Sequence, residues 1–598
     1  MSPGNLEKPM RFSSLIAGVV LATAAMVYQA NAADAPVVIK FSHVVTPDAP
    51  KGRGAQKFKE LAEAALPGRV KIELYPNSQL YKDKEEMEAL QLGSVQMLAP
   101  SLAKFGPLGA REFEVFDLPY IFPDKAGLRA VTQGPIGREL LGRLASKGIT
   151  GLAFWDNGFK ILSANRALRS PDDLLGLKMR IQSSKILEAE MKALGASPQV
   201  MAFSEVYQGL QTGVVDGTEN PPSNMFTQRM HEVQKHATLT NHGYLGYAVI
   251  VNKPFWDGLP GEIREALEKA MVEATIYVNE LAQRDNDEAL AAMKASGKTQ
   301  FVTPSPEEQK AWMAAMEPVQ KEMAGRVGHG LLAAIKAATG TGPVPTKPAP
   351  NAGTAVPKEP TATVPVVVAY APALAAPLSA LLLALVLIAV FFPRIPFLDR
   401  LEEIIVATLI AAATVLIFVA VVQRYSLSAS ANLARFASDH GFDWLRLAAL
   451  ATFKTLRSVN LTWAQELCIY MFVWMAKFGA ALGVRQGIHV GVDVLTNQLG
   501  ANSRRIVIPF ALISGAVFTG LVGGLGLLFV THIAHTDQTS ADLELPMWLV
   551  YLAIPLGSFL MCLRFLQVLF SYLRGGTLPG HAHGHADLPG LAHDEVAA

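Results

Sequence analysis

The stretch ALAAPLSALLLALVLIAVFF at residues 373–392 is the first of five apolar runs in the second part of the chain. Each run is about long enough to cross ~30 Å of hydrocarbon as a helix that rises 1.5 Å per residue. The sequence therefore predicts an all-α transmembrane bundle of about five spans. The four further runs cover residues 404–422, 461–483, 506–530 and 545–573.

The N-terminus, residues 1–32, has the pattern of an export signal. Lys8 and Arg11 precede an apolar run at 15–27, and Ala30-Asn31-Ala32 supplies a small-x-small cleavage pattern. We expect cleavage after Ala32. An uncleaved membrane anchor is the alternative.

Residues 33–340 alternate short β-rich runs with helical runs, which is typical of an α/β fold. The sequence has no Gly-x-Ser-x-Gly elbow, phosphate-binding loop or His-Glu-x-x-His motif, so we expect no enzyme activity, cofactor or metal. The net charge of +1 gives no reason to expect a nucleic-acid partner. A proline-rich linker at 341–370 joins this exported domain to the spans, an organisation that indicates a two-lobed solute receptor closing by a hinge.

Four motifs make the solute receptor more specific. They are WDNGFK (155–160), GLKMRIQ (176–182), MAFSE (201–205) and VDGTENP (215–221). In this order and spacing they resemble the substrate-binding proteins of TRAP transporters, the tripartite ATP-independent periplasmic transporters for organic acids. The resemblance covers essentially all of residues 37–335.

The resemblance implies a site built around Arg180, whose planar guanidinium forms a paired salt bridge with the substrate carboxylate. A surface ion pair at the end of a strand is the alternative for Arg180. Family members often have arginine where this chain has Lys160, and the lysine resembles the dicarboxylate-binding members. Ser101 and Lys104 stand where sialic-acid receptors use a glutamate and an arginine. For Lys160 and Lys104 the alternative is a solvated surface position.

Four further residues complete the predicted substrate-binding set. Asn220 matches an asparagine that hydrogen-bonds the carboxylate, and Phe203 matches an aromatic residue that packs on the ligand's carbon chain; core packing is the alternative for Phe203. His242 and His43 are candidates to line the cleft or a hinge, or else ordinary structural histidines. The full set is Arg180, Lys160, Asn220, Phe203, Ser101, Lys104, His242 and His43.

Residues 395–575 resemble the small membrane subunit of the same transporters, with 371–394 as an added transmembrane helix. Ionisable side chains cost ~2.5–3.5 kcal/mol to place in hydrocarbon, so those in the spans should face protein. We expect one helix face to contact a separate large membrane subunit, with the domain's own bundle as the alternative. The residues of this face are Trp463, Glu466, Trp474, Lys477, Arg485 and His489.

Two further segments complete the membrane part. Residues 424–460 are expected to form an outer loop with an amphipathic run at 442–456. The His-containing tail at 576–598 is rich in glycine and proline, and we expect it to be disordered rather than metal-binding.

The predicted function is periplasmic capture of a C4-dicarboxylate such as malate, succinate or fumarate. The resemblance implies delivery to a separate large multi-span subunit that uses an ion gradient, with sodium as the ion. We expect the protein in a bacterial inner membrane, with its N-terminal domain in the periplasm and its C-terminus in the cytoplasm. Two alternatives remain open: uptake of a monocarboxylate or keto acid, and a membrane-tethered solute sensor.

Overall fold

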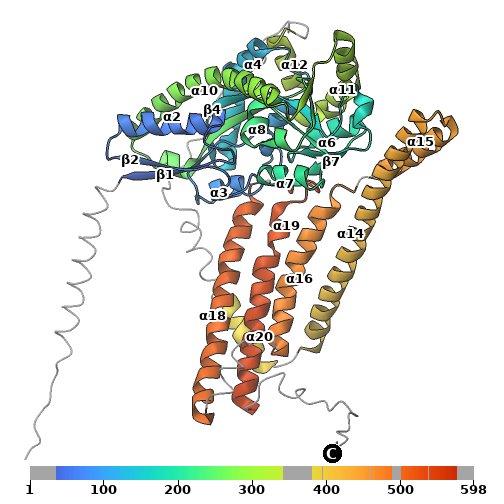
Figure 1. Ribbon diagram of the computed structural model, residues 1–598. Coiled ribbons are helices and arrows are strands. Elements are labelled where there is room, and N and C mark those ends of the chain that lie inside the picture. Colours follow the sequence, from blue (N-terminus) through green and yellow to red (C-terminus); the bar gives the residue numbers. More distant parts are fainter. Residues whose placement is uncertain are drawn as a thin grey trace, which may run out of the picture.

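The computed structural model describes residues 36–340, 380–392, 395–459, 461–487, 500–536 and 538–575. Within these residues an α/β body sits on one end of a bundle of long helices (Figure 1). The expected signal segment, the linker at 341–370 and the tail at 576–598 lie outside the described residues.

Lobe 1 of the body is built on a five-stranded sheet. Its strands are β1 (Val37–Ser42), β2 (Val70–Tyr75), β3 (Met97–Leu98), β4 (Ile149–Phe159) and β10 (Tyr244–Asn252). The order is β2-β1-β3-β10-β4; β1 pairs in parallel with β2 and β3, whereas β10 is antiparallel to β3 and β4. Apolar side chains of the sheet pack against α2 (Pro50–Ala65) and α10 (Gly261–Ser296), with Trp155 fully buried among them.

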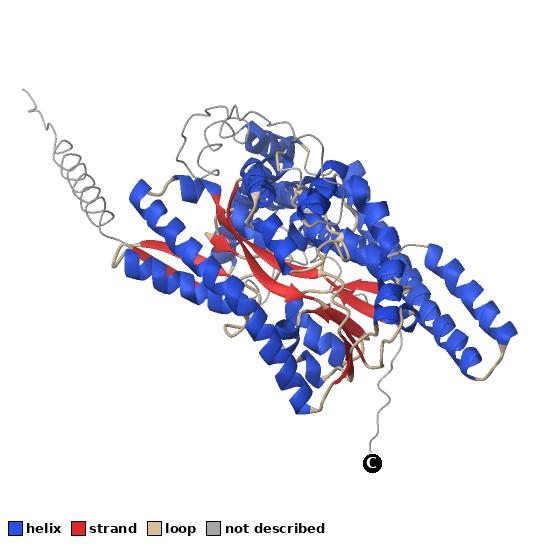
Figure 2. Ribbon diagram, turned by 90° about the horizontal axis from the view of Figure 1, so that it is seen from above, coloured by secondary structure: helices blue, strands red, loops and turns tan. Residues whose placement is uncertain are grey.

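Lobe 2 is built on a six-stranded sheet. Its strands are β5 (Ile161–Ala164), β6 (Lys178–Ile181), β7 (Ser197–Val200), β8 (Gly217–Asn220), β9 (His236–Thr238) and β11 (Gln300–Val302). They follow the order β11-β9-β5-β8-β6-β7. Seen from above, the strands of the two sheets form a band across the body with helices on both sides (Figure 2). The arrangement confirms the predicted two-lobed α/β fold.

Two chain crossings and one long helix join the lobes. β4 ends at Phe159 and β5 begins at Ile161, so Lys160 is the single residue between the two sheets. The return crossing lies beside it, and the Lys160 N–H donates to the Gly243 carbonyl at 2.8 Å. The 36-residue α10 contacts β4 of lobe 1 and α8 (Pro222–Thr227) of lobe 2. A helix of this length spans ~54 Å, enough to brace both lobes.

Local sequence signals explain where several helices begin. Ser305 and Glu308 form a capping box ahead of α11 (Pro306–Val327). Ser184 caps α6 (Lys185–Ala193) by accepting the Leu187 N–H. The other helices of the body are α3 (Glu86–Gln91), α4 (Lys125–Thr132), α5 (Pro135–Arg143), α7 (Val206–Gln211), α9 (Lys253–Asp257) and α12 (His329–Ala338).

Among the residues that the structure describes, four C-terminal helices are long and apolar enough to cross a membrane. They are α14 (Pro396–Asp439), α16 (Ala464–Gln486), α18 (Ala501–Ala534) and the pair α19 (Met547–Tyr551) and α20 (Ala553–Gly575), which follow one another. The first predicted run is described from 380 onward, where Ala380–Phe391 is a shorter apolar helix. Its Leu385 and Ala389 pack against Cys562 of α20. The predicted all-α membrane bundle is therefore present.

The segment expected as an outer loop forms a helical hairpin, and its predicted amphipathic run at 442–456 coincides with the second helix of that hairpin. α14 continues past the apolar run at 404–422 as far as Asp439, and α15 (Asp443–Ser458) turns back beside it. Small residues of this extension are buried, and Phe453 of α15 packs against Ala431 and against Leu175 of lobe 2. Contacts with lobe 2 stabilise the polar extension of α14 as a helix. Hydropathy alone could not predict this extension.

A buried ion network ties three spans together at the end of the bundle away from the body. Arg564 of α20 contacts Asp399 at 2.7 Å and Glu402 at 2.9 Å, both on α14. Arg485 of α16 contacts Asp399 at 3.1 Å. Arg564 and Glu402 are 2% and 1% exposed, so each charge depends on the other.

Arg564→Ala should therefore lower the free energy of unfolding by ~3–5 kcal/mol, because Glu402 would be left buried without its cation. Denaturant unfolding in detergent measures this loss. Arg400→Ala is the matched control, since Arg400 on the same α14 turn is exposed and has no ion pair among the described residues. Equal stability of the two variants would show that the network contributes nothing.

Candidate solute-binding site and docking surface

A cavity of ≈ 360 Å³ lies between the two lobes. Lobe 1 and lobe 2 both supply its walls, and charged, amide and aromatic side chains are all present. The lining residues are Val44, Val45, Lys51, Asp83, Glu86, Ser101, Lys104, Arg180, Gln182, Phe203, Asn220, Asn224, Leu245 and Tyr247. Five of the eight predicted substrate-binding residues are among them: Arg180, Asn220, Phe203, Ser101 and Lys104.

Arg180 projects from β6, and its guanidinium is held in place by the backbone of lobe 2. Its Nε and Nη2 donate to the Met201 carbonyl at 3.1 and 2.9 Å, and its guanidinium lies 5.7 Å from the centre of the Phe203 ring. A guanidinium has five N–H donors, so three remain for another acceptor. The backbone contact fixes the plane of the guanidinium before any carboxylate arrives.

Asp83 connects the lobes at the edge of the cavity. One carboxylate oxygen contacts Lys104 Nζ at 2.8 Å, and the other accepts the Phe203 N–H of lobe 2 at 3.3 Å. Burial alone would raise the pKa of Asp83, but Lys104 and Arg180 outweigh it and hold the pKa at about 2. Asp83 is therefore ionised and links the lobes in this closed arrangement.

Lys51 and Glu86 form a buried pair of charges that sequence reasoning missed. Lys51 Nζ donates to the Ala99 carbonyl at 2.9 Å and lies 4.0 Å from the centre of the Tyr247 ring. Burial lowers the pKa of Lys51 to about 8 and raises the pKa of Glu86 to about 7, although each charge opposes the other's shift. A lysine in the first turn of a helix is typical of a solvated position, so no sequence signal indicated Lys51.

The cavity carries an excess of positive charge. The three cations Lys51, Lys104 and Arg180 face the two carboxyl groups of Asp83 and Glu86. Protonation of Glu86, whose pKa lies near neutrality, increases the excess further. Such a site favours an anion, and a second negative charge on that anion adds to the attraction.

The structure does not bring Lys160 or His242 to this cavity. Lys160 Nζ contacts Glu219 at 3.0 Å inside the crossing between the lobes. His242 places Nε2 at 3.0 Å from Glu219 and 3.3 Å from Glu190, while its Nδ1 lies 2.7 Å from Thr240 Oγ1. All these side chains are buried. The ammonium of Lys160 is therefore paired with Glu219 inside the hinge and does not face the solute.

The same hinge cluster holds three potential metal-ligating groups. Atoms of Glu190, Glu219 and His242 lie within 4.8 Å of one another. The Lys160 ammonium occupies the cationic position beside Glu219, which fits an ion-pair cluster better than a metal centre. Burial and the neighbouring Glu219 raise the pKa of Glu190 well above its ordinary value, so Glu190 is neutral here.

His43 also lies away from the lining of the solute cavity. It is 2% exposed and makes an edge contact with Phe41, with ring centres 6.4 Å apart. Burial, together with the charge of Lys51, lowers the pKa of His43 to about 3. The placement is that of a neutral histidine in the core of lobe 1.

Lys160→Met tests the hinge position of Lys160 against a direct contact with ligand. Loss of the ammonium leaves Glu219 buried without its partner, so the ligand-free protein should lose ~3–5 kcal/mol of stability. Affinities for succinate and for a monocarboxylate should fall by similar factors. A selective loss of succinate binding with unchanged stability would restore the direct-contact interpretation; thermal unfolding and calorimetry give the two readouts.

Comparison with known proteins finds a family match for each of the two parts of the chain. Residues 41–326 match the family "bacterial extracellular solute-binding protein, family 7", and residues 449–575 match the DctQ component of tripartite ATP-independent periplasmic transporters. The chain is 70% identical over 304 residues to the C4-dicarboxylate-binding periplasmic protein DctP of Rhodobacter capsulatus, covering 91% of that protein and 51% of this chain. It is 59% identical over 190 residues to the small permease protein DctQ of the same organism, covering 84% of that protein and 32% of this chain. This chain belongs to the TRAP transporter family.

Solved structures resemble the DctP part. One is a TRAP solute-binding protein from Shewanella oneidensis with bound succinate, at 42% identity and a TM-score of 0.50, covering 51% of this chain and all of that one. Another, from Sulfurospirillum deleyianum, also holds succinate, at 44% identity and a TM-score of 0.50, covering 51% of this chain and 99% of that one. The TRAP families matched here are transport components and not enzymes, as predicted.

The DctQ part presents an ordered loop to the DctP part. The Glu466 carboxylate accepts the backbone N–H groups of Ala541, Asp542 and Leu543 at 3.0, 3.0 and 2.7 Å. It also accepts the Ser540 hydroxyl at 3.2 Å. Glu466 therefore fixes the loop at 540–543, and both belong to the DctQ part.

Residues in and beside this loop contact both lobes of the DctP part. Toward lobe 1, the Thr539 N–H donates to the Pro107 carbonyl at 2.9 Å and the Tyr551 hydroxyl donates to Glu88 at 2.6 Å. Toward lobe 2, Lys185 Nζ donates to the Asp542 carbonyl at 2.6 Å. A change in the angle between the lobes would break one set of contacts, so this surface fits one lobe arrangement.

The other residues predicted to face a large TRAP subunit have varied positions. Arg485 belongs to the ion network with Asp399, and Lys477 packs against Gly557 of α20. Trp474 stacks on Phe478 with ring centres 5.9 Å apart, and Trp463 precedes α16. His489 lies outside the described residues. Contact of this face with a separate subunit stays a prediction.

Proposed function

We propose that this chain captures a C4-dicarboxylate such as succinate, malate or fumarate and presents it to a separate large membrane subunit. The observation that carries the proposal is the set of three cations around the cavity between the lobes, with Arg180 on lobe 2 and Lys51 and Lys104 on lobe 1. A short ligand with a carboxylate at each end can be bound by both lobes at once. Binding then favours the closed form.

Each side of the cavity has donors that can bind one carboxylate of the ligand. Arg180 retains three N–H donors after its contacts with Met201, enough for a paired salt bridge to one carboxylate. Lys51 and Lys104 add two ammonium groups within lobe 1. The related proteins with bound succinate, and the DctP relative named for C4-dicarboxylates, agree with this assignment.

The docking surface supports the membrane orientation that we propose. The DctP part meets the C-terminal end of α18 and the N-terminal end of α20, so α20 runs away from it (Figure 1). With the DctP part in the periplasm, the end of α20 reaches the cytoplasmic side. Transport by the large subunit is driven by an ion gradient, with sodium as the proposed ion.

Arg180→Ala should abolish dicarboxylate binding by the full-length chain in calorimetry, with a loss of ~2–5 kcal/mol for an unpaired charge. Arg180→Lys should recover part of the affinity, because it keeps the charge but not the paired donors. Arg169→Ala, at an exposed position on the same lobe, is the matched control. The assignment fails if Arg180→Ala binds succinate like the unchanged protein, or if a panel of acids shows tighter binding of a keto monocarboxylate.

The pH dependence of binding tests Glu86. A dianion beside Glu86 raises the pKa of this carboxyl above its starting value of about 7, so affinity should rise as pH falls from 8 toward 7. The limit for uptake of one proton is about tenfold per pH unit. Glu86→Gln should show a smaller rise in affinity between pH 8 and pH 7, because the remaining rise comes from Lys51, whose pKa lies at about 8 in the unchanged protein; the exposed control Glu85→Gln should keep the full dependence. An unchanged slope in Glu86→Gln would exclude Glu86 as the linked group.

A further inference from the structure

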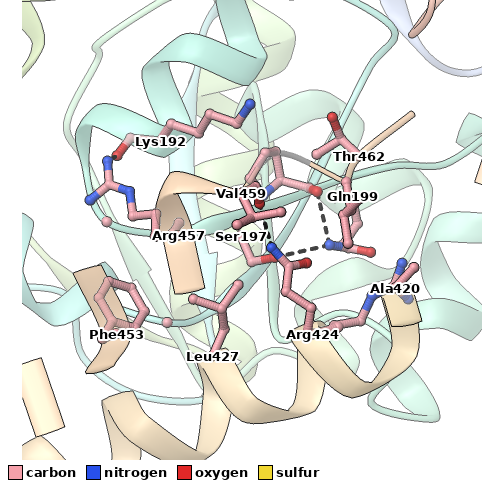
Figure 3. A pocket seen from close by; sticks show the side chains of 16 residues that line it. Lys192, Ser197, Gln199, Ala420, Arg424, Leu427, Phe453, Arg457, Val459 and Thr462 are labelled. Atoms are coloured by element: carbon pink, nitrogen blue, oxygen red, sulfur yellow. Dashed lines mark hydrogen bonds between the residues drawn. The ribbon is translucent and has the colours of Figure 1, made fainter. Parts of the chain in front are cut away.

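A second cavity, of ≈ 610 Å³, lies between lobe 2 and the α14–α15 hairpin (Figure 3). It is separate from the solute cavity and shares no lining residue with it. Residues 192 and 195–199 of lobe 2 form one wall, and Leu427 of α14 and Phe453 of α15 lie on the other. The cavity therefore exists only while lobe 2 rests on the membrane part.

The cavity is basic. Lys192, Arg424 and Arg457 line it, and the described lining residues include no carboxylate. Lys192 pairs with Glu188 at 2.5 Å, and Arg457 donates to the Lys192 backbone carbonyl. Arg424 is partly buried and has no hydrogen-bond or ion-pair partner in the part of the chain that the structure describes. A guanidinium withdrawn from water in this way favours an anion from outside the chain.

The cavity lies beside the end of the apolar run of α14. Phe418 and Val422 of α14 are 66% and 47% exposed, as expected for side chains that face lipid, and the apolar run ends at Val422. Arg424 follows two residues later. Val459 and Leu461, which also line the cavity, lie just before α16, the next span. This is the depth at which phospholipid head groups lie.

We propose that this cavity binds the phosphate of an anionic phospholipid head group from the leaflet on the DctP side. Arg424 is the principal donor and Arg457 the second, while Leu427 and Phe453 contact the apolar part of the lipid. Because residues of lobe 2 complete the site, the lipid binds the docked form and stabilises it. The inference depends on the docked arrangement and not on the identity of the solute.

The test uses the full chain in nanodiscs of phosphatidylcholine with or without phosphatidylglycerol. Native mass spectrometry should show retained phosphatidylglycerol, with about tenfold less in Arg424→Gln, the effect of removing one charge-assisted hydrogen bond. Arg446→Gln, an exposed arginine on α15 outside the cavity, should retain it. Equal retention in Arg424→Gln, or an equal loss in Arg446→Gln, would overturn the site.

A second measurement separates lipid from a soluble anion and from misfolding. Hydrogen exchange of β7 should slow in the phosphatidylglycerol nanodiscs, and this protection should vanish in Arg424→Gln. The same protection by soluble glycerol phosphate in phosphatidylcholine nanodiscs would overturn the lipid assignment. Succinate binding by each variant, measured in parallel, reports an intact DctP part, so a failure of the dicarboxylate proposal is seen separately.

Discussion

The buried contact between Lys160 and Glu219 fixes the geometry on which both the cavity and the docking surface depend. Lys160 is the single residue between the two sheets, its N–H is bonded to Gly243, and its ammonium lies 3.0 Å from Glu219 of β8. The second oxygen of Glu219 meets His242 of the return crossing at 3.0 Å. One ion pair thus joins three segments of the hinge, and a charge this deeply buried holds its place because separation would leave two unpaired ions.

The solute cavity and the docking surface are built from the same two lobes. Inside the cleft, Asp83 of lobe 1 accepts the Phe203 N–H of lobe 2, while Arg180 and the two lysines leave positive charge in excess. On the DctQ side, Thr539 contacts Pro107 of lobe 1, and Asp542, in the loop fixed by Glu466, contacts Lys185 of lobe 2. An anion that draws the lobes together therefore also sets the spacing of the outer contacts.

Much of this organisation could be predicted from the sequence, and the exceptions have physical reasons. Hydropathy predicted the membrane bundle, and the four motifs led to Arg180, Asn220 and Phe203 through their resemblance to TRAP substrate-binding proteins. Lys51 was missed because its burial depends on Tyr247, almost 200 residues away along the chain. Lys160 sits in a motif, yet its side chain points to Glu219, a choice that only tertiary packing decides. The polar half of α14 was taken for a loop because its partner is another lobe and not lipid.

The loop at 540–543 has a kinetic consequence for a receptor joined to its membrane unit in one polypeptide. A tethered receptor collides with its target at an effective concentration of roughly millimolar, so encounters are frequent whether or not cargo is present. Discrimination must then come from how long each encounter lasts. An open receptor can satisfy the contacts of one lobe at a time and leaves quickly, whereas a closed one satisfies both and stays. By holding the loop at 540–543 in place, Glu466 makes the lifetime of the docked state depend on whether the two lobes are closed.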